Sequence, residues 1–226
     1  VYADKLISWL SSAEMVVRIP YGNSEREDRE NNDAKERFLI GLLKAANDRL
    51  VDKLQPTVRH QLAWFVVLRG WYAIRALMVK DDEGDTHVEI QPWDPLHTYW
   101  GEGKNGLAWA CYKTKRTPTE IKAIWGVELQ GEGKGPDDDD GIDVYEFYDS
   151  EDNVVCTDDT VLKKRTKHGS KKVPVVLGPV GATPLVQAVS DTGNLDTIED
   201  YGESCFKSSR ELFEKHNFMM STMLEL

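Results

Sequence analysis

Four consecutive carboxylates, Asp137 to Asp140, are the most prominent cluster of side chains in the sequence that could bind a metal ion. Hard cations take oxygen ligands, so a metal-dependent nuclease could use this run together with Asp143. The alternating ligands, central glycine and closing glutamate of an EF-hand loop are missing, however. Neighbouring carboxylates in an extended loop also point in different directions. We therefore predict a solvated loop and no metal site.

A basic segment, residues 163–172, stands out in this otherwise acidic chain. One interpretation is a solvated hairpin tip, in which lysines also discourage edge-to-edge pairing of strands. The other is a contact to phosphate or to an acidic neighbouring subunit. No aromatic residues interleave with the cations to stack bases, which favours the first interpretation. The candidates for contact with another subunit or with DNA are Lys163, Lys164, Arg165, Lys167, Lys171 and Lys172.

No other motif suggests catalysis. The histidines lack a paired metal-binding spacing, and Ser204, in Tyr201-Gly202-Glu203-Ser204, lacks the second glycine of a nucleophile elbow. Gly101-Glu102-Gly103 has no third glycine and no following helix, so it is not a dinucleotide-binding turn. We predict a protein without enzymatic activity, cofactor or metal. Its three separated cysteines are predicted to be buried free thiols: Cys111, Cys156 and Cys205.

Composition bounds the class of protein. The 226 residues suffice for one large domain or a domain with an extension, and 40% hydrophobic with 30% charged residues is a globular balance. Asp and Glu total 39 against 28 Lys and Arg, a formal charge of −11. That charge argues against a tight nucleic-acid clamp but allows a wall past which DNA slides.

Apolar stretches such as Leu62 to Leu68 are too short to span a bilayer. The chain shows no signal peptide and lacks an initial Met, so we expect it to be trimmed.

The first seventy residues are predicted to be mainly helical. A short amphipathic helix is expected over 1–13, a short strand over 15–21 and a solvated polar loop over 23–32. From Asp33 apolar residues recur at helical steps as far as Val51. A further helix is expected from 58 to a stop at Gly70.

The pattern changes to strands after Gly70. A hairpin is expected over 71–80 and 86–91, followed by an irregular corner, a strand over 107–115 and a short helix capped by Thr117 that ends near Gly126. A second hairpin is expected over 142–149 and 154–157, and a further strand over 173–177. From 200 the pattern turns helical to the last residue. Segregated helices and hairpins of this kind are typical of the α+β class, here with N-terminal helices, antiparallel β-hairpins and a long C-terminal helix.

Tryptophan is unusually frequent between residues 64 and 125. Aromatic packing between the hairpins and a helix is the main expectation for these side chains. Anchoring of an interface and an aromatic ligand pocket are the alternatives.

The order of these parts resembles the wing region of tailed-bacteriophage portal proteins of the long-tailed-phage type. The resemblance spans about residues 35–226 and rests on small motifs in a fixed order. These are Leu68-Arg69-Gly70 before the strand Trp71 to Val79, the corner Gln91-Pro92-Trp93-Asp94-Pro95, the strand Val173-Pro174-Val175-Val176, and Tyr201-Gly202-Glu203-Ser204 before a helix with Arg210, Leu212, Asn217 and Ser221.

The resemblance implies a structural protein with no catalytic residues. It implies a homo-oligomeric ring, usually dodecameric, at one vertex of the virion capsid, assembled in the host cytoplasm. Double-stranded DNA passes through such a ring, terminase docks on it, and head-completion or adaptor proteins attach later. Residues 1–199 would form a wing-like α+β domain, and 200–226 would begin a long helix toward the stem or channel. A different virion assembly or adaptor protein remains the alternative, with the metal-dependent nuclease third.

Overall fold

The computed structural model describes residues 2–13, 16–19, 26–80, 84–104, 106–129, 141–180, 204–206, 215 and 218–219. They form helices and antiparallel sheets, so the α+β prediction is confirmed. The chain divides into two compact units. Residues 1–72 with 177–226 make the first, and residues 73–176 make the second. Among the described residues no helix is both long and apolar enough to cross a membrane.

The first unit contains the helices α1 (Tyr2–Ser12), α2 (Arg26–Asp52) and α3 (Val58–Arg69). α1 packs on α3 around a small core of Ile7, Ala63 and Val67. Thr57 caps the start of α3, and Gly70 ends it with a φ of 70°, a backbone conformation that glycine adopts without strain. The stop predicted at Gly70 is therefore confirmed.

Two predictions for the N-terminal part are wrong. α2 begins at Arg26, inside the segment expected to be a solvated loop. Its first turns are polar on every side and give no hydrophobic period, although Glu and Arg are good helix formers. Residues 16–19 are not a strand. They run beside α2 instead, where the buried Glu36 carboxylate accepts a hydrogen bond from the Ile19 backbone N–H at 2.7 Å.

The strand β1 (Trp71–Lys80) pairs with β2 (Thr86–Trp93) in the predicted hairpin. β8 (Val175–Pro179) lies on the other side of β1 and completes the sheet order β2-β1-β8. The Ala76 N–H donates to the Pro174 carbonyl at 2.9 Å, and the Val180 N–H donates to the Gly70 carbonyl at 2.8 Å. Their order along the chain makes this pairing antiparallel as well.

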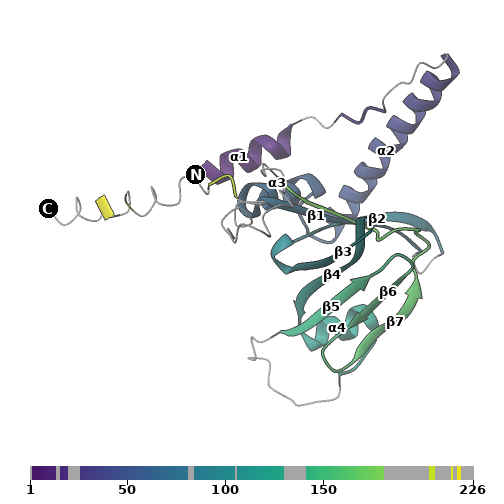
Figure 1. The fold of residues 1–226 in the computed structure, drawn as a ribbon, viewed down its shortest axis with the longest axis vertical. Coiled ribbons are helices and arrows are strands. Elements are labelled where there is room, and N and C mark those ends of the chain that lie inside the picture. The colour runs from purple at the N-terminus through teal and green to yellow at the C-terminus, as the bar shows by residue number, and fades with distance from the viewer. Residues whose placement is uncertain are drawn as a thin grey trace. The chain divides into compact units, whose positions relative to one another are not determined.

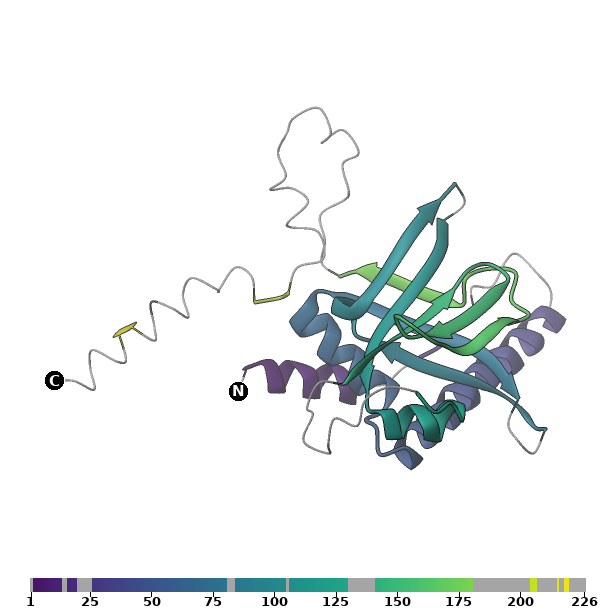
Figure 2. The same ribbon diagram turned by 90° about the horizontal axis from the view of Figure 1, so that it is seen from below.

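A second sheet in the order β3-β4-β5-β6-β7 lies within residues 73–176 (Figure 1). Its strands are β3 (Thr98–Gly103), β4 (Gly106–Arg116), β5 (Ile142–Tyr148), β6 (Asp152–Cys156) and β7 (Val161–Lys167). β3 was predicted to be an irregular corner and turn. Two of its six residues are glycines, which lower strand propensity, and cross-strand pairing with β4 overrides that local preference. The tip of the β3–β4 hairpin projects beyond the other strands (Figure 2).

Helix α4 (Pro118–Trp125) covers part of one face of this sheet. The Thr117 hydroxyl accepts a hydrogen bond from the Glu120 N–H, and the Glu120 carboxylate accepts one from the Thr117 N–H, so the predicted capping box is present. The fully buried Ile121 packs against Val144, Val155 and Leu162.

The predicted long C-terminal helix and the boundary between 199 and 200 fall largely outside the described residues. Helical backbone is described there only at Lys215, Phe218 and Met219.

Candidate interaction surface

The two faces of the five-stranded sheet differ in burial. Register places Ala110, Val144, Tyr148 and Val155 on one face, and all four side chains are buried. The residues between these four along each strand point to the opposite face. None of the described side chains on that face is buried, although most of them are apolar or aromatic. This open face includes Tyr99, Trp109, Cys111, Lys113, Lys115, Asp143, Tyr145, Phe147, Val154 and Cys156.

The side chains of the open face contact one another across the strands. The Trp109 and Phe147 rings stack with their centroids 5.8 Å apart. The Lys113 ammonium lies 5.6 Å from the centroid of the Tyr145 ring and forms an ion pair with Asp143 at 2.7 Å. Such cross-strand pairs order a surface that water would otherwise solvate. The result is a preformed aromatic face on the outside of the sheet.

Burial raises the pKa of the Cys111 thiol to about 11, with smaller contributions from Cys156 and Glu146. At neutral pH this thiol is therefore protonated and a weak nucleophile. The predicted burial of the cysteines is only partly correct. Cys111 and Cys156 are half-buried and Cys205 is exposed, and all three are free thiols.

The predicted basic segment begins on β7, at the edge of the sheet farthest from β3. Lys163, Lys164, Arg165 and Lys167 lie on β7, the last strand in the sheet order, so the first half of the segment is an edge strand and not a hairpin tip. Lys171 and Lys172 follow in an exposed turn. The structure thus brings the six candidate cations together along one edge and the loop that leaves it.

Arg165 differs from Lys164 and Lys167 because it has carboxylate partners among the described residues. Its guanidinium contacts the Asp149 carboxylate at 2.7 Å and the Asp152 carboxylate at 3.3 Å. Lys164 and Lys167 are exposed and have no ion pair with the described residues. The unneutralised charge of the edge therefore comes from the lysines.

Asp149 organises the turn between β5 and β6. Its carboxylate accepts hydrogen bonds from the Glu151 and Asp152 backbone N–H groups at 2.8 and 2.7 Å. These bonds, with the nearby Arg165, hold the pKa of Asp149 below its ordinary value. The His168 ring contacts the Asp149 carbonyl oxygen at 3.0 Å and accepts a hydrogen bond from the Ser170 N–H, so its contacts are those of a turn.

We expect Asp149→Asn to lower the free energy of unfolding by about 1 kcal/mol at pH 7, since the amide keeps an acceptor but loses the charge. A lowered folded-state pKa stabilises the protein above the unfolded-state pKa, and this stabilisation is lost as pH falls through the folded-state value. The difference from the wild type should therefore shrink between pH 7 and pH 3 in urea unfolding curves. Asp159→Asn, at an exposed position of the next turn, is the matched control. An equal difference at both pH values would contradict this role.

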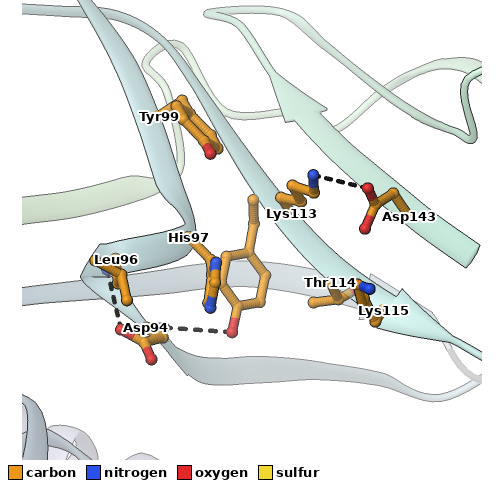
Figure 3. A pocket seen from close by; sticks show the side chains of 9 residues that line it. Asp94, Leu96, His97, Tyr99, Lys113, Thr114, Lys115 and Asp143 are labelled. Atoms are coloured by element: carbon orange, nitrogen blue, oxygen red, sulfur yellow. Dashed lines mark hydrogen bonds and ion pairs between the residues drawn. The ribbon is translucent and has the colours of Figure 1, made fainter. Parts of the chain in front are cut away.

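A pocket of about 660 Å³ opens beside the open face, at the end of β4 (Figure 3). It is bounded by the 3-10 helix η1 (Pro95–His97) and by residues of β4 from both faces of the sheet. Its lining residues are Asp94, Leu96, His97, Tyr99, Tyr112, Lys113, Thr114, Lys115 and Asp143. No motif in the sequence indicates this pocket, because the unpaired end of a strand has no sequence signature.

No protein-family model matches this chain. A search of curated proteins finds no significant similarity either. The candidate sites therefore rest on the residues and their geometry.

The remaining sequence candidates are not assembled into an active site. Asp143 is paired with Lys113, and Asp137 to Asp140 lie outside the described residues. Within the described part of the chain, no three His, Cys, Asp or Glu side chains are grouped so that they could hold a metal ion. The Ser204 hydroxyl donates to the Val67 carbonyl at 2.9 Å, in the last turn of α3, which is a structural contact.

Proposed function

We propose that this chain is the wing part of a phage portal subunit. It would act in a homo-oligomeric ring, dodecameric as in the family it resembles, at one vertex of the virion capsid. Double-stranded DNA would be packaged and ejected through the ring, and terminase and then head-completion proteins would dock on it. The chain itself would perform no catalysis and need no cofactor. Assembly would take place in the host cytoplasm.

The observation that carries the proposal is the pair of unlike surfaces on one sheet. A closed ring needs heterologous contacts, in which two different patches of neighbouring subunits meet. The edge strand β7 presents lysines that make no ion pair within the described part of the chain, whereas the chain as a whole carries a formal charge of −11. The open aromatic face offers a second patch of different chemistry. A lysine-rich edge also prevents indiscriminate strand pairing, so it favours a defined partner.

The order of elements agrees with the proposal. α3 ends at Arg69 before Gly70, β1 follows at once, and the β1–β2 hairpin leads through the corner at Asp94 and Pro95 into the second sheet. This is the order on which the resemblance to portal wings rests. The negative net charge suits a wall that DNA passes without being retained.

Particle mass and shape of the full-length protein test the function directly. Light scattering and negative-stain microscopy should show rings of uniform mass with a central hole. A protein that stays monomeric at high concentration would overturn the portal proposal. Rings that form only when a second virion protein is added would favour an adaptor instead.

The double substitution Lys164→Glu and Lys167→Glu should weaken subunit association of the full-length protein about tenfold in 0.1 M salt, because it reverses the free charges of the β7 edge. Arg165 is left unchanged, since its loss would disturb the Asp149 turn. Lys5→Glu with Lys35→Glu is the matched control, with the same change in net charge at exposed positions of α1 and α2.

Sedimentation velocity over a range of protein concentrations measures this effect. The weakening should shrink at 0.5 M salt, where the Debye length is shorter. Equal assembly of the β7 variant and the control would remove the basic edge from the subunit contact.

A further inference from the structure

The pocket at the end of β4 lies along the edge of a strand. Four consecutive residues of β4 line it, from Tyr112 to Lys115. Side chains of consecutive strand residues point to opposite faces of a sheet. Tyr112 and Thr114 belong to one face, whereas Tyr99, Lys113, Lys115 and Asp143 belong to the other. The pocket therefore extends from part of the open face to the free edge of β4, where backbone groups are presented.

The edge is unpaired for a structural reason. β3 pairs with β4 only as far as Thr98 opposite Tyr112, whereas β4 continues to Arg116 and pairs with β5 on its other side. Among the described residues, no strand follows β3 along Lys113 to Arg116. Alternate backbone N–H and C=O groups of this stretch therefore face the pocket.

The corner before β3 keeps the chain away from this edge. The Asp94 carboxylate accepts a hydrogen bond from the Leu96 N–H at 2.9 Å, and the Thr98 hydroxyl donates to the Asp94 carbonyl at 2.8 Å. Pro95 begins η1, which turns the chain out of line with β3. Figure 3 shows Asp94, Leu96 and His97 on one side of the pocket and Thr114 and Lys115 on the other.

The side chains of the pocket define the chemistry of its occupant. Asp94 caps η1 and Asp143 is paired with Lys113, so both carboxylates are already engaged. Lys115 is exposed and makes no ion pair with the described residues. Leu96 and Tyr99 are 60% and 50% exposed, which leaves apolar surface next to that free cation.

We propose that this edge is a docking site for an extended peptide segment of a partner protein. The segment adds a strand along Lys113 to Arg116, where β3 leaves off. Backbone hydrogen bonds to β4 hold it, as in other cases of strand addition. It places an acidic side chain at Lys115 and an apolar side chain on Leu96 and Tyr99. The inference concerns only the corner at Asp94 to His97, β4 and Asp143, and it holds whether or not the chain forms a ring.

The test uses a blocked hexapeptide of alternating valine and threonine with one central aspartate. We expect it to bind the 226-residue chain and to shift the backbone amide resonances of residues 113–116 in a titration followed by nuclear magnetic resonance. Methylating alternate backbone nitrogens of the peptide should weaken binding at least tenfold, because it removes hydrogen-bond donors without changing the side chains.

Charge exchange tests the specificity. Lys115→Glu should weaken binding of the aspartate peptide about fivefold, and a peptide with lysine in place of aspartate should regain that affinity on the variant. Leu96→Ala should weaken two interactions equally: binding of the aspartate peptide to the chain with Lys115, and binding of the lysine peptide to the Lys115→Glu variant. Both positions are exposed, so the variants should keep the fold.

Three outcomes would overturn the proposal. One is no shift at residues 113–116 at millimolar peptide. Another is equal binding of the methylated peptide. The third is equal binding of free acetyl-aspartate, which would make the site a simple anion contact.

Discussion

Arg75→Ala is expected to lower the free energy of unfolding by about 3–5 kcal/mol, because it leaves two carboxylates near the core without their cation. The Arg75 side chain is 8% exposed and contacts both Glu89 and Glu146. Its guanidinium also donates to the Tyr148 hydroxyl at 2.5 Å and to the Gln91 side-chain oxygen at 2.9 Å. The network joins β1 and β2 to β5 within residues 73–176.

Arg165→Ala is a matched control for this prediction. Arg165 also contacts two carboxylates, Asp149 and Asp152, but its side chain is 62% exposed. Water screens such a pair, so the loss should stay under about 1 kcal/mol. Urea unfolding followed by far-ultraviolet circular dichroism measures both variants. Similar losses for the two arginines would show that burial does not set the strength of the Arg75 network.

A double-mutant cycle separates the interaction between Arg75 and Glu146 from the other contacts of these two residues. Arg75→Met, Glu146→Gln and the combined variant should show a coupling energy of about 1–3 kcal/mol between the two positions. The combined variant should be more stable than Arg75→Met alone, because position 146 then no longer carries a negative charge beside the lost guanidinium. A coupling energy near zero would assign the loss to packing alone.

Trp93→Ala should cost about 3–5 kcal/mol, since it removes a large and fully buried side chain. The Trp93 ring is 0% exposed. It stacks on Tyr112 with centroids 4.9 Å apart and lies 5.8 Å from the Tyr148 ring. The same unfolding assay should give less than about 0.5 kcal/mol for Trp9→Ala, because Trp9 is 69% exposed on α1. A comparable loss at both tryptophans would contradict a core role for Trp93.

Trp93→Phe extends this prediction to the pocket. Phenylalanine keeps a stacking partner for Tyr112, so the loss should be smaller than for alanine. The Tyr112 hydroxyl accepts a hydrogen bond from the Asp94 N–H at 3.3 Å, which links the core to the corner that frees the β4 edge. Trp93→Ala should therefore also weaken peptide binding at that edge. The phenylalanine variant should bind nearly as well as the wild type.

The aromatic prediction from the sequence was right in part. Trp93 and Trp125 pack against hairpins and helix as expected. Trp109, by contrast, lies on the open face, where it stacks on Phe147. An indole that packs inside and one that lines a surface have the same sequence signature. Only the register of the strands tells which face each residue takes.

The sequence alone determined the features that depend on neighbouring residues. The caps at Thr117 and Gly70, the β1–β2 hairpin and the β5–β6 hairpin follow from turn chemistry and hydrophobic period within a few residues. The α+β class follows from their order.

The tertiary structure decided the features that depend on distant pairings. The basic segment became an edge strand because β6 pairs with β7, and β3 became a strand because β4 pairs with it despite its glycines. Arg75 found its partners at Glu89 and Glu146, the latter more than seventy residues away. The free edge of β4 exists because its two neighbours pair with different stretches of it, β3 with Gly106 to Tyr112 and β5 with Ala110 to Arg116. Such pairings join residues far apart in the chain, and no local pattern in the sequence records them.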